Sequence, residues 1–195
     1  MSKVPVYILA GGKSSRFGSD KARALFDGEP LVKRAVRMLT PAASRLSVVA
    51  DVPEKYSDLG LRTIADRAPG LGPLGGLDTA IADLEPGEHW LLLCCCDALV
   101  IRTAWLEQLL AHTHPGANAV AYKGDSWQPM PALYSRDCAS HIDVQIASDD
   151  RSLRNLLDQL TARALPIPAD WPDRWQANRP EDLGAFRSHA SEPDD

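Results

Sequence analysis

Residues 4–21 read VPVYILAGGKSSRFGSDK, and this stretch decides the fold. Its first part, Val4 to Ala10, is a continuous apolar run that ends at Gly11-Gly12. Continuous rather than alternating hydrophobicity indicates a strand that is buried on both faces. Two further runs have the same character, LSVVA at Leu46 to Ala50 and WLLLCCC at Trp90 to Cys96. The three runs together predict a sheet that is covered on both sides.

Helical patterns separate these strands. Apolar residues recur at the 3.6-residue period over Pro30 to Leu39 and over Leu74 to Leu84, and Pro30 suits the first turn of its helix. A further helix is expected from about Thr103 to Ala111, followed by strands at Ala117 to Tyr122 and Met130 to Tyr134. Alternating strands and helices predict an α/β fold with a mostly parallel sheet.

The last third of the chain has weaker patterns. Leu153 to Leu160 reads as a helix, Pro166 to Pro172 as a connector and Pro180 to Phe186 as a terminal helix. No repeat or linker divides the chain, so we expect a single domain over residues 1–187. The acidic residues 188–195 are predicted to be a disordered tail.

Composition excludes several classes of protein. Of the 195 residues 45% are hydrophobic and 24% charged, as in an ordinary globular domain. A formal net charge of -5 argues against nucleic acid binding, which needs clustered Lys and Arg. The start, MSKVPVYILAGG, carries too short an apolar run for a signal peptide or a membrane span. We therefore expect a cytoplasmic protein that binds no membrane and no nucleic acid. Any polyanion that it binds should be small.

Three consecutive cysteines, Cys94 to Cys96, end the third apolar run. Neighbouring strand residues point to opposite faces, which suits neither a disulfide nor a zinc site. We expect them to be small buried apolar residues in a reducing compartment.

The glycine-rich segment follows the first strand, at the edge of a parallel sheet where ligands collect. Gly11 and Gly12 let the backbone pass close to a ligand, and Gly18 can adopt a positive φ. Arg16 and Lys21 supply the charge that a triphosphate needs. The spacing matches neither the P-loop pattern GxxxxGK[ST] nor the dinucleotide fingerprint GxGxxG. The segment therefore predicts a phosphate-binding loop of another type.

Two acidic residues are candidates for the same edge of the sheet, Asp97 after a buried strand and Asp66 before a glycine-rich loop. Asp97 comes directly after WLLLCCC, where a hard cation that bridges phosphates needs an oxygen ligand; capping the turn before Ile101 is its alternative role. Asp66 precedes GLGPLGG at Gly70 to Gly76, a loop that can pack against a base or ribose. A plain strand-to-helix turn explains that loop equally well.

These motifs resemble the molybdenum cofactor guanylyltransferases, the MobA-like branch of the nucleotidyltransferases. LAGGKSSRFGSDK at Leu9 to Lys21 is similar to the family pattern LxGGxSxRxGxDK. The similarity continues through Asp66, GPLGG at 72–76, Cys96-Asp97, QPMPALY at 128–134 and NRPEDL at 178–183. It implies a Rossmann-like three-layer sandwich and the transfer of GMP from GTP to the molybdopterin cofactor, with Mg2+ bound and pyrophosphate released.

The resemblance also implies roles for single residues. The nucleotide-binding residues that it implies are Leu9, Ala10, Gly11, Gly12, Lys21, Asp66, Asp97 and Asn178. Asp97 would hold the magnesium ion, Arg16 and Lys21 would contact the phosphates, and these three would be the catalytic residues. GTP and molybdopterin are the implied substrates, with transient contacts to molybdoenzymes or cofactor-insertion proteins.

Three positions depart from the family pattern. No asparagine follows the second strand near Ala50 and Asp51, Cys95 stands where proline is common, and Arg179 stands where threonine is common. The missing asparagine and Arg179 leave open a non-catalytic nucleotide-binding adaptor.

A cytidylyltransferase for the same cofactor and a sugar-phosphate nucleotidyltransferase also stay open. Gly11-Gly12 and Asp20-Lys21 favour the guanylyl branch, because the cytidylyl branch tends to have alanine-glycine at the first pair.

Overall fold

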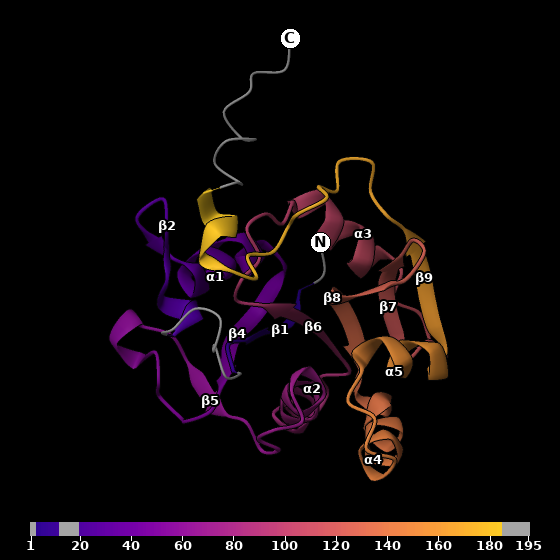
Figure 1. The fold of residues 1–195 in the computed structure, drawn as a ribbon. Coiled ribbons are helices and arrows are strands. Elements are labelled where there is room, and N and C mark those ends of the chain that lie inside the picture. The colour runs from indigo at the N-terminus through magenta and orange to yellow at the C-terminus, as the bar shows by residue number, and fades with distance from the viewer. Residues whose placement is uncertain (1–2, 12–19, 185–195) are drawn as a thin grey trace.

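The computed structural model describes residues 3–11 and 20–184, which form one seven-stranded sheet with helices on both faces (Figure 1). The strands of this sheet are β1 (Val4–Leu9), β4 (Ala43–Ala50), β5 (Thr63–Ala65), β6 (Trp90–Cys95), β7 (Ala119–Lys123), β8 (Trp127–Ser135) and β9 (Ala162–Pro166). The helices are α1 (Leu31–Leu39), α2 (Pro73–Ala82), α3 (Thr103–Ala111), α4 (Ala139–Ala147) and α5 (Leu153–Gln159). A small ladder pairs β2 (Leu25–Phe26) with β3 (Glu29–Pro30). No helix among the described residues is long and apolar enough to cross a membrane.

The sheet has the order β5-β4-β1-β6-β8-β7-β9. Strands β5, β4, β1 and β6 run parallel, whereas β8 is antiparallel to both of its neighbours and β9 is parallel to β7. The prediction of a mostly parallel sheet is confirmed. Because β1 lies between β4 and β6, its carboxyl end faces the loops that follow both of those strands.

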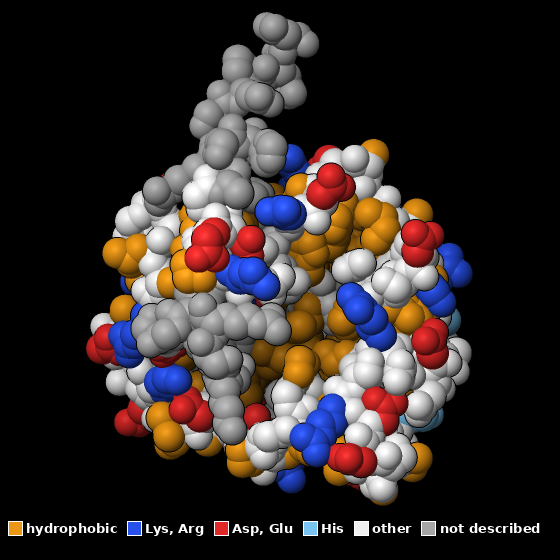
Figure 2. Space-filling model, in the orientation of Figure 1, with side chains coloured by type: hydrophobic (Ala, Val, Ile, Leu, Met, Phe, Trp, Pro, Cys, Tyr) orange, Lys and Arg blue, Asp and Glu red, His pale blue; other side chains and the backbone are white. Residues whose placement is uncertain are grey.

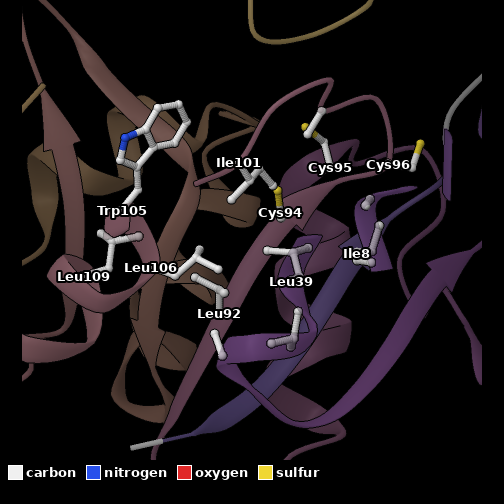
Figure 3. Packing of buried hydrophobic residues seen from close by; sticks show 14 of the residues in the cluster. Ile8, Leu39, Leu92, Cys94, Cys95, Cys96, Ile101, Trp105, Leu106 and Leu109 are labelled. Atoms are coloured by element: carbon white, nitrogen blue, oxygen red, sulfur yellow. The ribbon is translucent and has the colours of Figure 1, made fainter. Parts of the chain in front are cut away.

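The layers follow from the alternation of side chains along the strands. Val6 and Ile8 of β1 point into a core shared with α1 and α3, whereas Tyr7 points into a second core shared with α2, α4 and α5. Figure 3 shows Leu39 of α1 and Leu92 of β6 packed within the first core. The predicted three-layer sandwich is thus confirmed, with α1 and α3 on one face of the sheet and the other three helices on the opposite face (Figure 1).

The strongest patterns are placed almost as predicted. Helix α3 has the predicted bounds, and α1 begins one residue after Pro30, which is the N-cap rather than part of the first turn. Pro30 adopts an extended conformation because it closes the ladder of β2 and β3. Strands β5 and β9 and helix α4 carry no strong pattern and were not predicted.

Strand β8 is longer than predicted, because it starts at Trp127 and includes two prolines. A proline cannot donate to a sheet ladder and is tolerated at irregularities. The register between β7 and β8 shifts at Ala121/Tyr122, opposite the stretch that holds Pro129 and Pro131. The interruption therefore explains how a proline-containing segment lies inside the sheet.

The end of the chain is described in part. Residues 167–172 form the predicted connector without helix or strand, although Pro166 itself ends β9. A helix begins at Pro180, as predicted, and is described as far as Gly184. The predicted tail at 188–195 lies outside the described residues.

Candidate active site

The carboxyl ends of β1 and β6 meet through the backbone. Cys96 N donates to Leu9 O at 3.0 Å, and Ala10 N donates to Val49 O at 2.9 Å. Leu9, Ala10 and Gly11 therefore lie between the strand ends of β4 and β6, as expected of a ligand-binding edge. Among the sequence-predicted residues, Gly12 and Arg16 lie outside the described residues.

Lys21 and Asp97 meet at this edge. Lys21 begins the short 3-10 helix η1 (Lys21–Arg23), and Asp97 directly follows β6. Lys21 Nζ donates to Asp97 Oδ2, across 76 positions of sequence. Both side chains are mostly buried, so that little water screens their charges. The structure thus brings together two residues for which the family resemblance implies catalytic roles, Lys21 and Asp97.

The second oxygen of Asp97 suits a hard cation. Asp97 Oδ1 is buried and has no hydrogen-bond partner among the described residues. No group of three or more His, Cys, Asp or Glu side chains that could hold a metal ion occurs among those residues either. A magnesium ion often takes one or two carboxylates and completes its shell with phosphate oxygens and water. The orphaned oxygen therefore fits a cation that arrives with a phosphorylated substrate.

The turn that carries Asp97 is held by the segment at 175–177. Ala177 N donates to Asp97 O at 3.0 Å, and Leu99 N donates to Trp175 O at 2.7 Å. The side chain of Gln176 adds a hydrogen bond from Nε2 to Cys95 Sγ at 2.7 Å. These contacts place Asn178, the next residue of the segment, near the same strand end.

A cavity of about 580 Å³ adjoins this segment. Its lining comprises Asp173, Arg174, Trp175, Gln176, Asn178, Arg179, Glu181 and Asp182. Asp182 Oδ2 accepts from the backbone N–H groups of Asn178 and Arg179 at 2.7 and 2.8 Å, which caps the helix that starts at Pro180. NRPEDL therefore has a structural role here, and Asn178 and Arg179 face a cavity beside the Asp97 turn.

Asp66 is held within its own loop. Its Oδ1 accepts from Ala68 N at 2.9 Å and lies 3.3 Å from Thr79 Oγ1 of α2. Gly75 allows the close approach, because a Cβ there would lie 2.6 Å from Ala68 O. The carboxylate thus orders the turn into α2, and its predicted contact with the nucleoside stays a prediction.

Gly76 has a similar role at the end of β1. A Cβ at this position would lie 2.6 Å from Leu9 Cδ2, so that the glycine lets α2 pack closely against the end of β1. GPLGG is therefore a packing motif as well as a loop that borders the edge.

The cysteines fill the core as expected. Cys94, Cys95 and Cys96 are free and buried, and Figure 3 shows them along the end of β6. Burial raises the pKa of the Cys96 thiol and of the Cys95 thiol, so both keep their protons at neutral pH. Cys95 and Cys96 therefore pack as small apolar side chains and lack the thiolate form that a nucleophile needs.

Figure 2 shows the face that carries this edge. It is hollowed near its centre, over the region of β6 and β8 in Figure 1, and hydrophobic side chains form the floor of the hollow. Lys and Arg side chains stand around its rim, interspersed with Asp and Glu side chains. A hollow with an apolar floor and charged groups at its rim can accept a flat ring system that carries polar groups.

Two residues that the sequence did not single out as site residues lie close to Lys21. The carboxylate of Asp20 accepts from Ala22 N at 3.1 Å, and the hydroxyl of the buried Tyr56 lies 3.1 Å from Asp20 Oδ2. Asp20 entered the sequence argument only as a marker of base preference. The sequence around Tyr56 does not indicate its contact with Asp20, because the two residues lie in separate loops, 36 positions apart.

The chain is similar in sequence to known proteins. A profile of the MobA-like NTP transferase domain matches residues 6–164. A probable molybdenum cofactor guanylyltransferase from Opitutus terrae is 31% identical over 184 residues, which is 90% of each chain. A molybdenum cofactor guanylyltransferase from Pseudomonas aeruginosa is 32% identical over 187 residues, which is 93% of each chain.

Solved structures share the fold. Molybdopterin-guanine dinucleotide biosynthesis protein A from Archaeoglobus fulgidus superposes with a TM-score of 0.80 at 20% identity, covering 96% of this chain and 99% of that one. A CMP:2-keto-3-deoxy-manno-octonic acid synthetase complexed with CTP reaches a TM-score of 0.75 at 16% identity, covering 97% of this chain and 99% of that one. The chain therefore shares the fold of these two proteins. By the profile match and the relatives together, the chain belongs to the MobA-like NTP transferase family.

Proposed function

We propose that this protein transfers GMP from GTP to the molybdopterin cofactor and releases pyrophosphate. The observation that carries the proposal is the pair of Lys21 and Asp97, a cation and a mostly buried carboxylate held together at the carboxyl ends of neighbouring parallel strands. The names of the relatives supply the substrates, since those proteins are described as molybdenum cofactor guanylyltransferases.

The reaction is a displacement at phosphorus. The terminal phosphate of the pterin attacks the α-phosphorus of GTP, a P–O bond forms, and the bond to the β-phosphate oxygen breaks. The attacking phosphate is already ionised at neutral pH, so no general base is required. Catalysis then depends on in-line positioning and on charge around the transferring group.

The residues of the chain divide these tasks. Lys21 moves from Asp97 to the phosphates of the nucleotide and stabilises the charge that builds up on the departing pyrophosphate. Asp97 would hold Mg2+, since its Oδ1 has no hydrogen-bond partner among the described residues. The ion would supply Lewis-acid polarisation of the α-phosphate. Arg16 is proposed to contact the pyrophosphate.

Binding of the nucleoside is assigned to the strand ends and the two glycine-containing loops. Leu9, Ala10, Gly11 and Gly12 are proposed to border the guanine nucleotide, together with Asp66. Asn178 is proposed to lie near the ion or the second substrate, since its segment is hydrogen-bonded to Asp97. We further propose a cytoplasmic location and transient contacts with molybdoenzymes or cofactor-insertion proteins.

The test measures pyrophosphate release with each of the four nucleoside triphosphates, with and without Mg2+ and with and without the molybdenum cofactor. We expect release only with GTP, the cofactor and Mg2+ together. Faster release with CTP would replace this assignment by a cytidylyltransferase. Release with a sugar phosphate as acceptor would indicate a sugar-phosphate nucleotidyltransferase. Binding of GTP without any release would indicate a non-catalytic adaptor.

A further inference from the structure

The buried phenol of Tyr56 connects three parts of the molecule. Tyr56 lies in the loop after β4, is fully buried, and has its backbone tied down by Leu59 N and Leu61 N at 3.0 and 3.2 Å. Its hydroxyl lies 3.2 and 3.1 Å from the two carboxylate oxygens of Asp20, and 3.4 Å from Ala10 O at the end of β1.

Asp20 in turn fixes the backbone at the beginning of η1, where Lys21 lies. Asp20 is the N-cap of η1, since its Oδ1 accepts from Ala22 N. Lys55 Nζ and Arg23 Nε add charge partners at 3.5 and 3.8 Å from Oδ2. These contacts hold the backbone immediately before Lys21.

The loop after β4 is also clamped to η1 from outside. Arg23 makes a two-point contact with the carboxylate of Asp58 at 2.8 and 2.9 Å, and it donates to Lys55 O at 2.8 Å. Lys55 pairs with Asp51 at 2.7 Å, in the stretch after β4 where the family pattern often has an asparagine. These contacts join the loop after β4 to η1 around Asp20.

We infer that Tyr56 is a positioning residue for nucleotidyl transfer, which acts through Asp20 to direct Lys21 at the phosphates of the nucleotide. This inference rests on the proposed function. Burial raises the pKa of Tyr56, so the hydroxyl keeps its proton at neutral pH and donates to the carboxylate. When Asp20 is held in place, the backbone before Lys21 has fewer accessible conformations. The ammonium of Lys21 then loses less conformational entropy when it contacts Asp97 or a phosphate.

The structure supplies a matched control in Tyr122. This tyrosine is also fully buried, and its hydroxyl donates within the core, to Trp105 O at 2.8 Å, with Gln108 Oε1 at 3.0 Å. Tyr56→Phe and Tyr122→Phe remove the same atom from equally buried rings. They differ in that only the first is connected to Lys21.

The experiment measures kcat/KM for pyrophosphate release in Tyr56→Phe, Asp20→Asn and Tyr122→Phe, and in the first two combined with Lys21→Ala. We expect Tyr56→Phe and Asp20→Asn each to lower kcat/KM about tenfold, as for a lost hydrogen bond to a charged group. Tyr122→Phe should lower the melting temperature to a similar extent as Tyr56→Phe while leaving kcat/KM unchanged. In the Lys21→Ala background the tenfold effect should disappear, because the residue that Tyr56 positions is absent.

Two results would overturn the inference. One is a Tyr56→Phe protein with the kinetics of Tyr122→Phe, and the other is a tenfold loss that persists in the Lys21→Ala background. If the unaltered protein releases no pyrophosphate, the proposed function fails instead. The same variants are then compared by equilibrium binding of GTP with Mg2+, where Tyr56→Phe should weaken binding about tenfold only when Lys21 is present.

Discussion

A cluster of charged side chains lies at the carboxyl ends of the strands, and another lies at their amino ends. The two clusters differ in how many hydrogen-bond partners their carboxylate oxygens have. At the carboxyl ends, Asp97 has Lys21 on one oxygen and no hydrogen-bond partner among the described residues on the other. At the amino ends, Asp83 accepts three hydrogen bonds on Oδ2 at 2.8–2.9 Å and one on Oδ1 at 2.8 Å.

The second cluster, the amino-end network, comprises Tyr7, Arg45, Arg62, Asp83 and Glu88. Asp83 follows α2, which runs back toward the starts of the strands, and Glu88 precedes β6. Arg45 donates to Asp83 and Glu88 at 2.8 and 2.7 Å. Every carboxylate oxygen of Asp83 has a cation, which is the arrangement of a structural network.

The two clusters show how a ligand-binding site can be distinguished from a structural ion-pair network. A buried polar atom without a partner costs free energy, and a ligand that binds beside Asp97 would offset that cost. A satisfied network stabilises the fold and leaves no oxygen for a ligand. The comparison therefore predicts that charge removal at one end abolishes activity and that charge removal at the other end reduces stability.

The largest effect is expected at the carboxyl ends. Lys21→Ala and Asp97→Ala should each reduce turnover by about 10² to 10³, equivalent to roughly 3 to 4 kcal/mol, because each removes an electrostatic contact with the reacting phosphates. Pyrophosphate release at saturating GTP measures this, with Arg37→Ala as a control that breaks only the exposed pair with Glu29. Near-normal release by both site variants would refute the assignment.

A smaller effect, on stability, is expected at the amino ends. Asp83→Asn leaves Arg45 and Arg62 without their shared carboxylate and should lower the free energy of unfolding by about 2 kcal/mol, less than for a fully buried pair. Urea denaturation measures this loss. The kcat per folded molecule should stay unchanged, and a decrease comparable with that of Asp97→Ala would show that the two ends are not independent.

The smallest effect is the pH dependence of the amino-end network. Burial alone would raise the pKa of Asp83, but hydrogen bonds from Arg62, Arg45 and Tyr7 outweigh it and hold that pKa well below the usual range. The folded state therefore binds the proton less readily than the unfolded chain. The contribution to stability is fully present above the unfolded pKa of about 4 and is lost as pH falls through the folded pKa.

The measurement is urea denaturation of the unaltered protein and of Asp83→Asn at a series of pH values. The difference between their free energies of unfolding should be constant near neutrality and should shrink below about pH 4. A difference that stays constant into strong acid would show that Asp83 is not stabilised as a carboxylate by its partners.

Prediction from the sequence succeeded where the signal is local. The continuous apolar runs that became β1, β4 and β6 and the periodic segment that became α3 are confirmed, because burial on two faces or on one face leaves a repeat in the chain. Strand β5 has only three residues, and β9 buries only one of its five residues, so neither leaves an apolar run in the sequence. They were missed because their partner strands, rather than their own residues, define them.

The candidate site divides in the same way. Gly11, Lys21 and Asp97 could be selected from the sequence, because glycines and charges directly after buried strands point to the ligand-binding edge. The contact of Tyr56 with Asp20 could not, since it joins residues 36 positions apart through two irregular loops.

By itself, the sequence determined the α/β layering, the mostly parallel sheet and the residue types that stand at its carboxyl edge. Only the tertiary structure decided that β6 lies beside β1, so that Lys21 reaches Asp97 across 76 positions, and that Oδ1 of Asp97 is left without a partner among the described residues. The physical reason is that periodicity records which face of an element is buried, whereas pairing between distant strands depends on the packing of the whole chain.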